Sequence, residues 1–437
     1  MMWLSQSWLK VRSSFWFLPG LIVLVAVALA VVLIESEAWF GAELFERWPR
    51  LFGSGASGAR GLLGTVASSM ITVAGVVFSI TVVVLSLASS QYTSRVLRNF
   101  MVDRVNQAVL GIFLGIFAYC LVVLRTIRGA EEGGFVPPLA VLFGLLLAFV
   151  GIAMLIYFIH HISVTIQATH ILAAVADETV QVIDRQFPEG ADDSDADPPA
   201  QPDGPQQDWH PVASAKSGYV QNVDTAGLVA LAAERKAVLW VERGVGQFVI
   251  EGAPIARVSG GALDDDDTAR LRALYAIGRQ RTVEQDAAFG IRQIVDVALK
   301  GLSPGINDTT TAIMCVDYLT AILFRLADRR IETCYRDEEG QLRLLTGGPT
   351  YASLVGGALD QVRQNAEGNV AVLKRLLGSL EQLAAATISA PRRRVLAEHA
   401  RAVLELARRS VAAARDRQVI EECWDRVSRL LPAAGDA

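Results

Sequence analysis

Four apolar stretches dominate the first 160 residues of this chain. A helix needs about 20 apolar residues to cross the hydrocarbon core of a bilayer, and each stretch approaches that length. They run from Phe15 to Ile34, from Met70 to Leu87, from Ala108 to Ile127 and from Leu139 to Ile159. No uncharged run of this length follows them. The sequence therefore predicts a domain of four transmembrane helices in residues 1–160.

Composition indicates that a soluble part accompanies these spans. The 437 residues are enough for two or three domains. Hydrophobic residues make up 52% of the chain, but the 19% of charged residues is too high for a protein that lies wholly in lipid. The net charge of -5 lacks the basic character of a nucleic-acid binder, so we expect no nucleic-acid partner.

The orientation of the spans rests on their flanking charges. With the N-terminus inside, the inner and outer loops each hold five Lys or Arg residues, but Lys10 and Arg12 lie close to the first span. The four cysteines are far apart, and no pair has the spacing of a zinc site, which is typical of reduced thiols in the cytosol. We expect both termini in the cytoplasm, with no metal and no cofactor.

A hydroxyl stripe follows the second span. Its members are separated by 4, 7, 7 and 4 residues and, at about 100° per residue, fall within about 40° of one another. They are Ser68, Thr72, Ser79, Ser86 and Ser90. Small residues let helices pack closely, and hydroxyls also line water-filled paths. Both interpretations, helix packing and pore lining, remain open.

The fourth span is followed by a predicted stalk and a linker. No Gly or Pro interrupts residues 152–187, so a stalk helix over 161–187 should reach into the cytosol. Its apolar face would need another subunit or the soluble part to cover it, which favours a homo-oligomer. Residues 188–209 are acidic and proline-rich, and their composition predicts a disordered linker.

The remaining residues predict a cytosolic α+β domain, so the fold class is a mainly α membrane protein with such a domain attached. Residues 210–262 are rich in expected strands, and "GQFVIEGAPIARV" resembles half of a barrel-sandwich domain of the biotinyl or lipoyl type. No lysine occupies a tight turn there, so no carried cofactor is expected. Residues 263–437 are mainly helical, with helices expected over 283–300 and 309–328.

The turn "SPGINDTTTA" joins these two helices. Asp308 suits an N-cap, and Pro304 with Gly305 suits a chain reversal. Hydroxyl and carbonyl groups crowd around this turn, and a charged pair spaced i,i+4 precedes it. The candidate residues for a small ligand, an ion or an interface are Ser303, Asn307, Asp308, Thr310, Arg292 and Asp296. Two interpretations remain open: the turn is a structural cap, or it is a site for a ligand or an interface.

Several stretches resemble one family over nearly the whole chain. They are "SSQYTSRVLRNFMVDR", "FIHHISVTIQ" and "FGIRQIVDVALKGLSPGINDTTTA". The chain is similar to the predicted bacterial membrane proteins labelled domain of unknown function 2254. The resemblance implies a multi-pass protein of the bacterial inner membrane. It implies no activity, so no catalytic residue is carried over.

Two functions of different classes fit this sequence. The first is an oligomeric channel or passive transport protein, lined by the second span and gated by its cytosolic domain. The second is a membrane-anchored sensor or scaffold whose cytosolic domain binds a ligand or a partner. No Ser/His/Asp set, P-loop or metal-ligand spacing is present, so we do not expect an enzyme.

Overall fold

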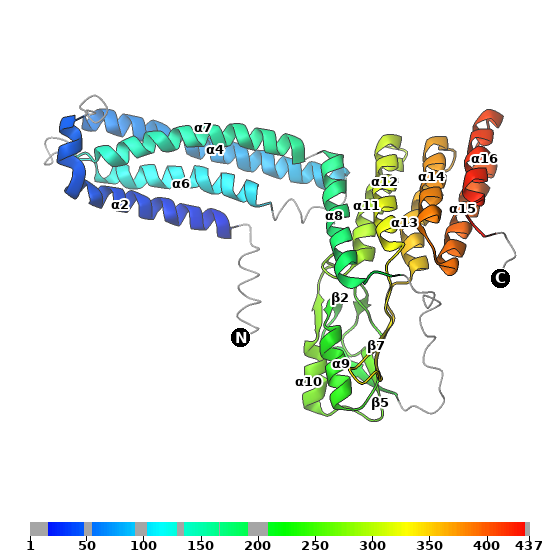
Figure 1. Ribbon diagram of the computed structural model, residues 1–437. Coiled ribbons are helices and arrows are strands. Elements are labelled where there is room, and N and C mark those ends of the chain that lie inside the picture. Colours follow the sequence, from blue (N-terminus) through cyan, green and yellow to red (C-terminus); the bar gives the residue numbers. More distant parts are fainter. Residues whose placement is uncertain are drawn as a thin grey trace. The chain divides into compact units, whose positions relative to one another are not determined.

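The chain forms two compact units, Met1–Gln167 and Ala168–Ala437, and each is described by itself. The structure is a computed structural model (Figure 1). It describes residues 16–47, 55–91, 103–128, 135–165, 167–190 and 209–432. Most of the expected linker, residues 191–208, lies outside these ranges.

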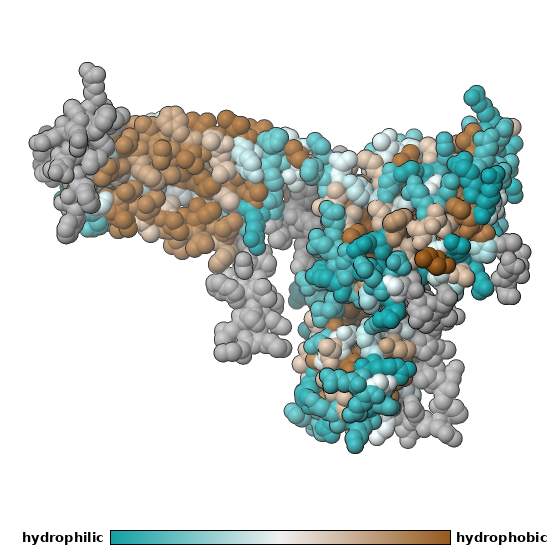
Figure 2. All heavy atoms as spheres, viewed as in Figure 1, coloured by the Kyte–Doolittle hydropathy of each residue, from teal (hydrophilic) through white to brown (hydrophobic). Residues whose placement is uncertain are grey.

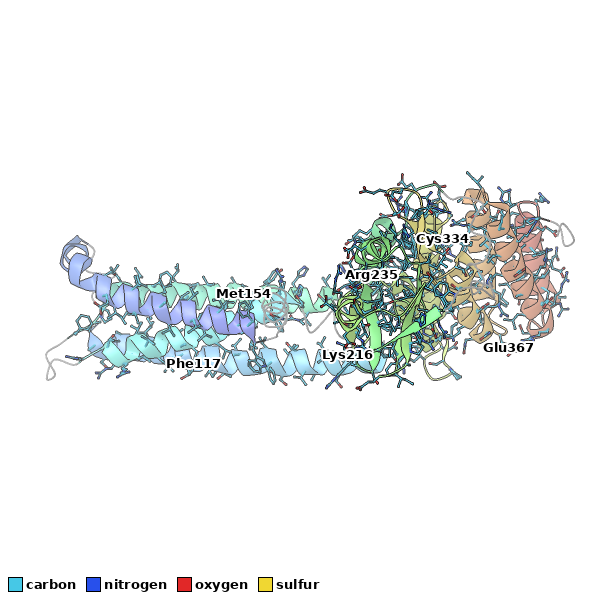
Figure 3. All side chains as sticks on the ribbon, turned by 90° about the horizontal axis from the view of Figure 1, so that it is seen from below. Phe117, Met154, Lys216, Arg235, Cys334 and Glu367 are labelled. Carbon is cyan, nitrogen blue, oxygen red and sulfur yellow. The ribbon has the colours of Figure 1, made fainter. Side chains whose placement is uncertain are left out.

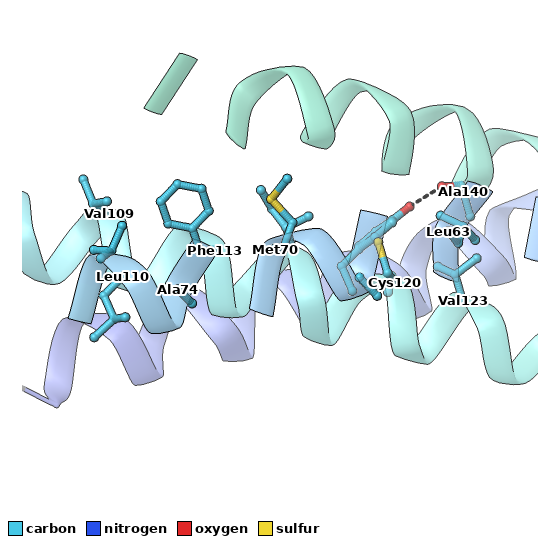
Figure 4. Packing of buried hydrophobic residues seen from close by; sticks show 14 of the residues in the cluster. Leu63, Met70, Ala74, Val109, Leu110, Phe113, Cys120, Val123 and Ala140 are labelled. Carbon is cyan, nitrogen blue, oxygen red and sulfur yellow. Dashed lines mark hydrogen bonds between the residues drawn. The ribbon is translucent and has the colours of Figure 1, made fainter. Parts of the chain in front are cut away.

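The first unit is a bundle of long apolar helices. They are α2 (Phe17–Arg47), α4 (Ala56–Gln91), α6 (Arg104–Thr126) and α7 (Pro138–Thr165). Helix α6 contacts the other three and is the most buried of the four candidate spans in this unit. Its Phe113 and Val123 pack with Leu63 and Met70 of α4 in one buried cluster (Figure 4). The Tyr119 hydroxyl on α6 donates a hydrogen bond to the Ala140 carbonyl of α7 (2.7 Å), so a buried polar group is satisfied.

The outside of this bundle is also apolar. Large side chains such as Val25, Phe78, Phe149 and Ile156 are exposed. The visible face of the unit is mostly hydrophobic in Figure 2, whereas the second unit is mostly hydrophilic. A surface of this kind is stable in a lipid environment, where burying apolar side chains against one another is not required.

Five helices in the described residues are long and apolar enough to cross a membrane. Four of them belong to the first unit: Phe17–Ser36 within α2, Ala56–Leu87 within α4, and the whole of α6 and α7. The fifth is α12 (Thr309–Leu326), which the sequence analysis did not count as a span. It contacts α8, α11, α13 and α14 of the second unit, and its Val316, Leu319 and Leu323 are fully buried there.

The expected stalk is not one continuous helix. Helix α7 ends at Thr165, and α8 (Ala168–Gln186) begins at Ala168. The apolar face of α8 packs against α11 and α12, so its Leu172 and Val182 are buried within the second unit. The helix therefore does not need another subunit to cover its apolar face. The absence of Gly and Pro permitted a long helix, but packing against α11 and α12 determines where α8 belongs.

The end of α7 carries a polar contact within the first unit. His161 Nε2 lies 2.7 Å from Asp103 Oδ2, and the other oxygen of Asp103 accepts a hydrogen bond from the Val105 amide (2.9 Å). Asp103 therefore caps the N-terminus of α6 and holds the last turns of α7 beside it.

Two sheets make up the β layer of the second unit. Sheet order is β1-β5-β3-β8-β7 in one and β4-β2-β6 in the other. The strands of the first sheet are β1 (Trp209–Ala213), β5 (Pro254–Ser259), β3 (Leu239–Val241), β8 (Leu342–Thr346) and β7 (Cys334–Arg336). Those of the second are β4 (Phe248–Val249), β2 (Gly218–Val223) and β6 (Tyr275–Gly278), and short helices α9 (Thr225–Glu234) and α10 (Asp265–Ala273) accompany them.

The larger sheet joins distant parts of the chain. β3 pairs in parallel with β8, with Leu239 opposite Leu344, while β3 with β5 and β7 with β8 pair antiparallel. The β layer thus takes strands from both sides of α11 and α12, and it is not the half barrel-sandwich confined to residues 210–262 that the glycine pattern suggested. That pattern reflects local turns, whereas the parallel partner of β3 lies beyond three helices, α10, α11 and α12.

The helical layer is a stack of three hairpins. They are α11 (Ala287–Leu302) with α12, α13 (Tyr351–Asn365) with α14 (Val370–Ala386), and α15 (Ala390–Ser410) with α16 (Ala414–Ser428). α11 contacts α13 and α13 contacts α15, while α12 contacts α14 and α14 contacts α16, so the hairpins stack in two rows. In Figure 3, Lys216 and Arg235 lie in the β layer and Glu367 lies in the helical layer.

A buried arginine closes one end of the first hairpin. Arg392, at the start of α15, is only 1% exposed. Its guanidinium donates hydrogen bonds to the carbonyls of Leu326 (3.1 Å), Ala327 (2.9 Å) and Arg329 (2.6 Å). It also lies 4.8 Å from the ring centroid of Tyr351. The cation therefore satisfies carbonyls at the C-terminal end of α12, where the helix dipole also favours positive charge.

Candidate functional site

The hydroxyl stripe of α4 faces outward from the bundle. Ser68, Thr72, Ser79 and Ser86 are all exposed, and Ser90 lies in α4 with its side chain outside the described part. The opposite face of α4 carries the buried contacts to α6 and α7. The stripe therefore neither lines a path through this single bundle nor packs inside it.

The stripe is nevertheless built from small groups, and one of its hydroxyls bonds within the helix. Thr72 Oγ1 donates to the Ser68 carbonyl (2.7 Å), one turn earlier on the same helix. A Cβ added to Gly61 or Gly75 would meet nothing within 4 Å, so the helix surface is open at both positions. Such a face allows the backbone of another helix to approach closely.

The turn between α11 and α12 is exposed and held by its own backbone. Asn307 has φ 49° in the left-handed region, and its amide donates to the Ser303 carbonyl (2.9 Å). Asp308 is the N-cap: its Oδ1 accepts from the Thr311 amide (3.0 Å) and its Oδ2 from the Thr311 hydroxyl (2.6 Å). The Thr311 hydroxyl is the main reason why the pKa of Asp308 lies below its usual range.

The same turn is the first of three neighbouring hairpin turns. Asn369, the N-cap of α14, donates from Nδ2 to Thr309 Oγ1 (2.9 Å), and the Gly368 amide donates to Ser410 Oγ (3.1 Å). These bonds link the hairpins along one edge of the helical layer. Much of the polar crowding in the motif is thereby accounted for by capping and stacking.

The two charged candidates on α11 belong to a different contact. Arg292 pairs with Asp296 (2.7 Å) and donates to Gln361 of α13 (2.7 Å). The Ser303 hydroxyl donates a hydrogen bond to the Lys300 carbonyl (2.6 Å), and Thr310 is exposed. Among the described residues, these candidates therefore do not form one buried polar cluster, because the turn itself lies at the surface.

The second unit contains a pocket of about 550 Å³ that the sequence analysis did not find. It lies where the two sheets meet the helical layer. Strand ends contribute Val223, Val241 and Thr346, from β2, β3 and β8. A volume of this size lies within the usual range for small-molecule sites.

Helix ends form the other walls of the pocket. Thr225 begins α9, Ala287 and Ala288 begin α11, and Ser353 lies in the first turn of α13. The last residues of α8, Arg185 and Gln186, face these starts. Three helix N-termini thus border one pocket, and each contributes partial positive charge.

An ion pair is built into the pocket wall. Arg281 donates from Nε and from one terminal nitrogen to the two oxygens of Asp286, both at 2.9 Å. Burial raises the pKa of Asp286, and the Arg281 charge opposes that rise. Gly246, with φ 84°, passes beside the pair, and a Cβ there would overlap Asp286 and lie 2.8 Å from an Arg281 nitrogen. Only glycine fits this crossing without displacing the pair.

The other charges of the pocket differ in their partners. Glu332 accepts a hydrogen bond from Arg330 (2.5 Å). Arg185 has no carboxylate partner in the described part of the chain; its Nε donates to the Gln181 carbonyl (3.1 Å). Arg185 is thus the pocket charge that no opposite charge balances there.

The sequence held one signal for this pocket. "LLTGGPT" places two glycines and a proline between a strand and a helix, β8 and α13, and the capping box of Thr350 and Ser353 starts that helix. A glycine-rich link between a strand end and a helix start is a common frame for ligand sites. The other walls come from segments far apart in the sequence, so no local pattern could have joined them.

No group of three or more His, Cys, Asp or Glu side chains in the described ranges is placed to hold a metal ion. The described cysteines are free, and Cys334 is the exposed one among them.

Long apolar helices with apolar outer surfaces, joined in sequence to a unit of helices and strands, define a membrane protein. The comparison with protein families agrees. The chain belongs to the DUF2254 family, described as predicted membrane protein, whose profile matches residues 12–382.

Three mycobacterial relatives match nearly the whole chain. An uncharacterized protein of Mycobacterium bovis and two uncharacterized proteins from strains of Mycobacterium tuberculosis are each 34% identical to this chain over 437 residues. Each comparison covers 97% of this chain and 82% of the relative. No solved structure matches. The family resemblance seen in the sequence is thus confirmed, and any function must be argued from the geometry.

Proposed function

We propose that the protein is an oligomeric channel or passive transport protein of the bacterial inner membrane, with the α4 faces of several copies lining the path. The outward direction of the hydroxyl stripe carries this proposal. Ser79 and Ser86 are exposed on a bundle whose other exposed side chains are largely apolar. Hydroxyl groups that line water between copies would be hydrated, and the glycines of α4 would let those copies approach.

The proposal uses four spans and leaves α12 in the soluble unit. The buried face of α12 meets four helices of that unit, and Arg392 and Asp308 satisfy its two ends. Four spans put the residues before α2 and after α7 on one side of the membrane. The charges of Lys10 and Arg12 favour the cytoplasm for that side.

Flux measurements on purified protein in liposomes test this function. The variant Ser79→Leu/Ser86→Leu makes the stripe apolar, and Val76→Leu/Val83→Leu is its matched control. Both pairs are exposed on α4 and have the same spacing. We expect the wild type and the valine control to conduct, and the serine variant to lose conductance. If folded wild-type protein gave no flux for several ions at several pH values, the channel proposal would be overturned.

A second function is favoured by the pocket of the soluble unit. A membrane-anchored sensor would use the spans as an anchor and the pocket to bind its ligand. A folded protein that conducts nothing but binds a ligand in the pocket would support this alternative over the channel.

A further inference from the structure

We infer that the pocket of the second unit binds a small organic anion, in which one carboxylate or phosphate group is attached to an apolar body. This inference goes beyond the channel proposal and does not depend on it. Binding can be measured in a protein that conducts nothing.

The charge of the pocket points to the anion. Each carboxylate in its wall has an arginine of its own: Asp286 has Arg281, and Glu332 has Arg330. Arg185 remains with no opposite charge among the described residues. A guanidinium left in this way binds carboxylate and phosphate well, because two of its N–H groups match two oxygens.

The main chain around the pocket also favours an anionic ligand. The starts of α9, α11 and α13 border the cavity, and Gly347 and Gly348 lie between the end of β8 and α13. Helix N-termini favour negative charge, and glycines let a ligand approach the backbone. These features support the site, while the volume of the open pocket and the exposed Arg185 define it.

The rest of the pocket wall is largely apolar and would contact the apolar body of the ligand. Phe187, Val223, Val245 and Ile331 line the cavity, with Tyr335 beside them. Burial of apolar surface here would supply most of the affinity, and the polar groups would orient the ligand. A free inorganic anion would leave this wall in contact with water, so it should bind weakly.

The inference can be tested by calorimetry and thermal unfolding on the full-length protein in detergent. The probes are three matched pairs: benzyl phosphate with benzyl alcohol, phenylacetate with phenylacetamide, and adenosine monophosphate with adenosine. Inorganic phosphate is the seventh probe. We expect at least one anion to bind and to raise the unfolding temperature. Its neutral partner and inorganic phosphate should bind with an affinity that is lower by about tenfold or more.

Two variants place that binding in the pocket. Arg185→Gln should weaken it about tenfold or more, and Arg409→Gln, which changes an exposed arginine in the last turn of α15, should not. Ala288→Phe fills the cavity from the second position of α11 and should abolish binding. Its control, Ala352→Phe, changes the second position of α13 outside the lining.

The inference is overturned if no anion of the set binds the wild type or if neutral partners bind equally well. It is also overturned if Arg185→Gln and Ala288→Phe bind like their controls. Unfolding temperatures without ligand show that each variant is folded, so a loss of binding is distinguished from a loss of structure. If the site recognises phosphate alone, the phosphate probes should bind and phenylacetate should not.

Discussion

Gly290 of α11 crosses Thr179 of α8 at a distance that leaves no room for a side chain on the glycine. A Cβ at Gly290 would lie 2.9 Å from both Cβ and Cγ2 of Thr179 and would overlap its hydroxyl oxygen. The Thr179 hydroxyl is fully buried and donates to the Val175 carbonyl (2.6 Å). This crossing holds α8 against the helical layer and thereby positions Arg185 at the pocket.

Gly290→Ala should therefore destabilise the second unit by about 1–3 kcal/mol, because overpacking forces the two helices apart. Hydrogen exchange of α8 and α11 amides in the full-length protein would measure this loss. Gly378→Ala in α14 is the control, since a Cβ there meets nothing within 4 Å. It should be neutral or stabilising by up to about 1 kcal/mol. Equal effects of the two variants would contradict the close crossing.

Asp308→Ala should lower the free energy of unfolding of the second unit by about 1 kcal/mol, the usual effect of losing an N-cap. Asp308→Asn keeps a capping oxygen and should retain most of that stability. Thermal unfolding of the two variants checks this. If Asp308→Ala left stability unchanged but altered flux or anion binding, the turn would be a site and not a cap.

The cap of Asp308 also predicts a dependence on acid. Its pKa is lowered by the Thr311 hydroxyl and amide, so the folded state binds its proton less readily than the unfolded state. The stabilisation is present above the ordinary aspartate pKa of about 4 and is lost as pH falls through the lower folded value. Asp308→Asn should show a smaller loss of stability than the wild type in this acid range.

Arg392→Leu should destabilise the second unit by on the order of 3 kcal/mol, because three carbonyls lose a charged donor in a buried place. Arg394→Leu removes an exposed arginine two residues later and should have little effect. Thermal unfolding distinguishes them. A mild effect of Arg392→Leu would mean that water replaces the guanidinium at the end of α12.

His399 of α15 makes stability fall in mild acid. It lies 3.3 Å from Asp360, and burial lowers its pKa against the opposing effect of that carboxylate. The unfolded chain therefore takes up a proton near pH 6.5 before the folded one does, so stability decreases as pH drops below about 6.5. His399→Gln should flatten the unfolding temperature between about pH 6.5 and 5. The exposed His170→Gln on α8 controls for the loss of a surface imidazole.

If copies meet through α4, Ser79→Cys should crosslink between them in membranes. The background is Cys334→Ser, because Cys334 is the exposed thiol and the other described cysteines are buried. A short thiol crosslinker should yield dimers or larger species on a denaturing gel. Phe149→Cys, at an exposed apolar position of α7, should yield few. The reverse pattern would place the interface on α7 and remove the stripe from it.

Local signals predicted much of the fold. Apolar length marked the long helices of the first unit because hydropathy is summed over neighbours in sequence. The start of α12 at Thr309 and the N-cap at Asp308 followed from turn chemistry in the same way. Local signals did not predict the direction in which the α4 stripe faces. Periodicity shows that residues share a face but not which neighbour that face meets.

Nonlocal contacts explain what was missed. β3 pairs with β8 although three helices, α10, α11 and α12, separate them in sequence, and no pattern near Leu239 encodes Leu344 as its partner. Arg185 and Arg281 reach one pocket from segments on either side of the acidic linker. Fold-level pairing brings such residues together, so their shared role appears only in three dimensions.

The parallel pairing of β3 with β8 also sets an order for biosynthesis. The spans of the first unit and the strand β3 leave the ribosome well before β8 does. Until then β3 has β5 on one side and an unpaired edge on the other. A nascent chain must keep this edge from pairing with other strands while its N-terminal helices enter the bilayer. Ribosome-bound chains that stop before Leu342 should therefore depend on chaperones more than chains that extend past Thr346.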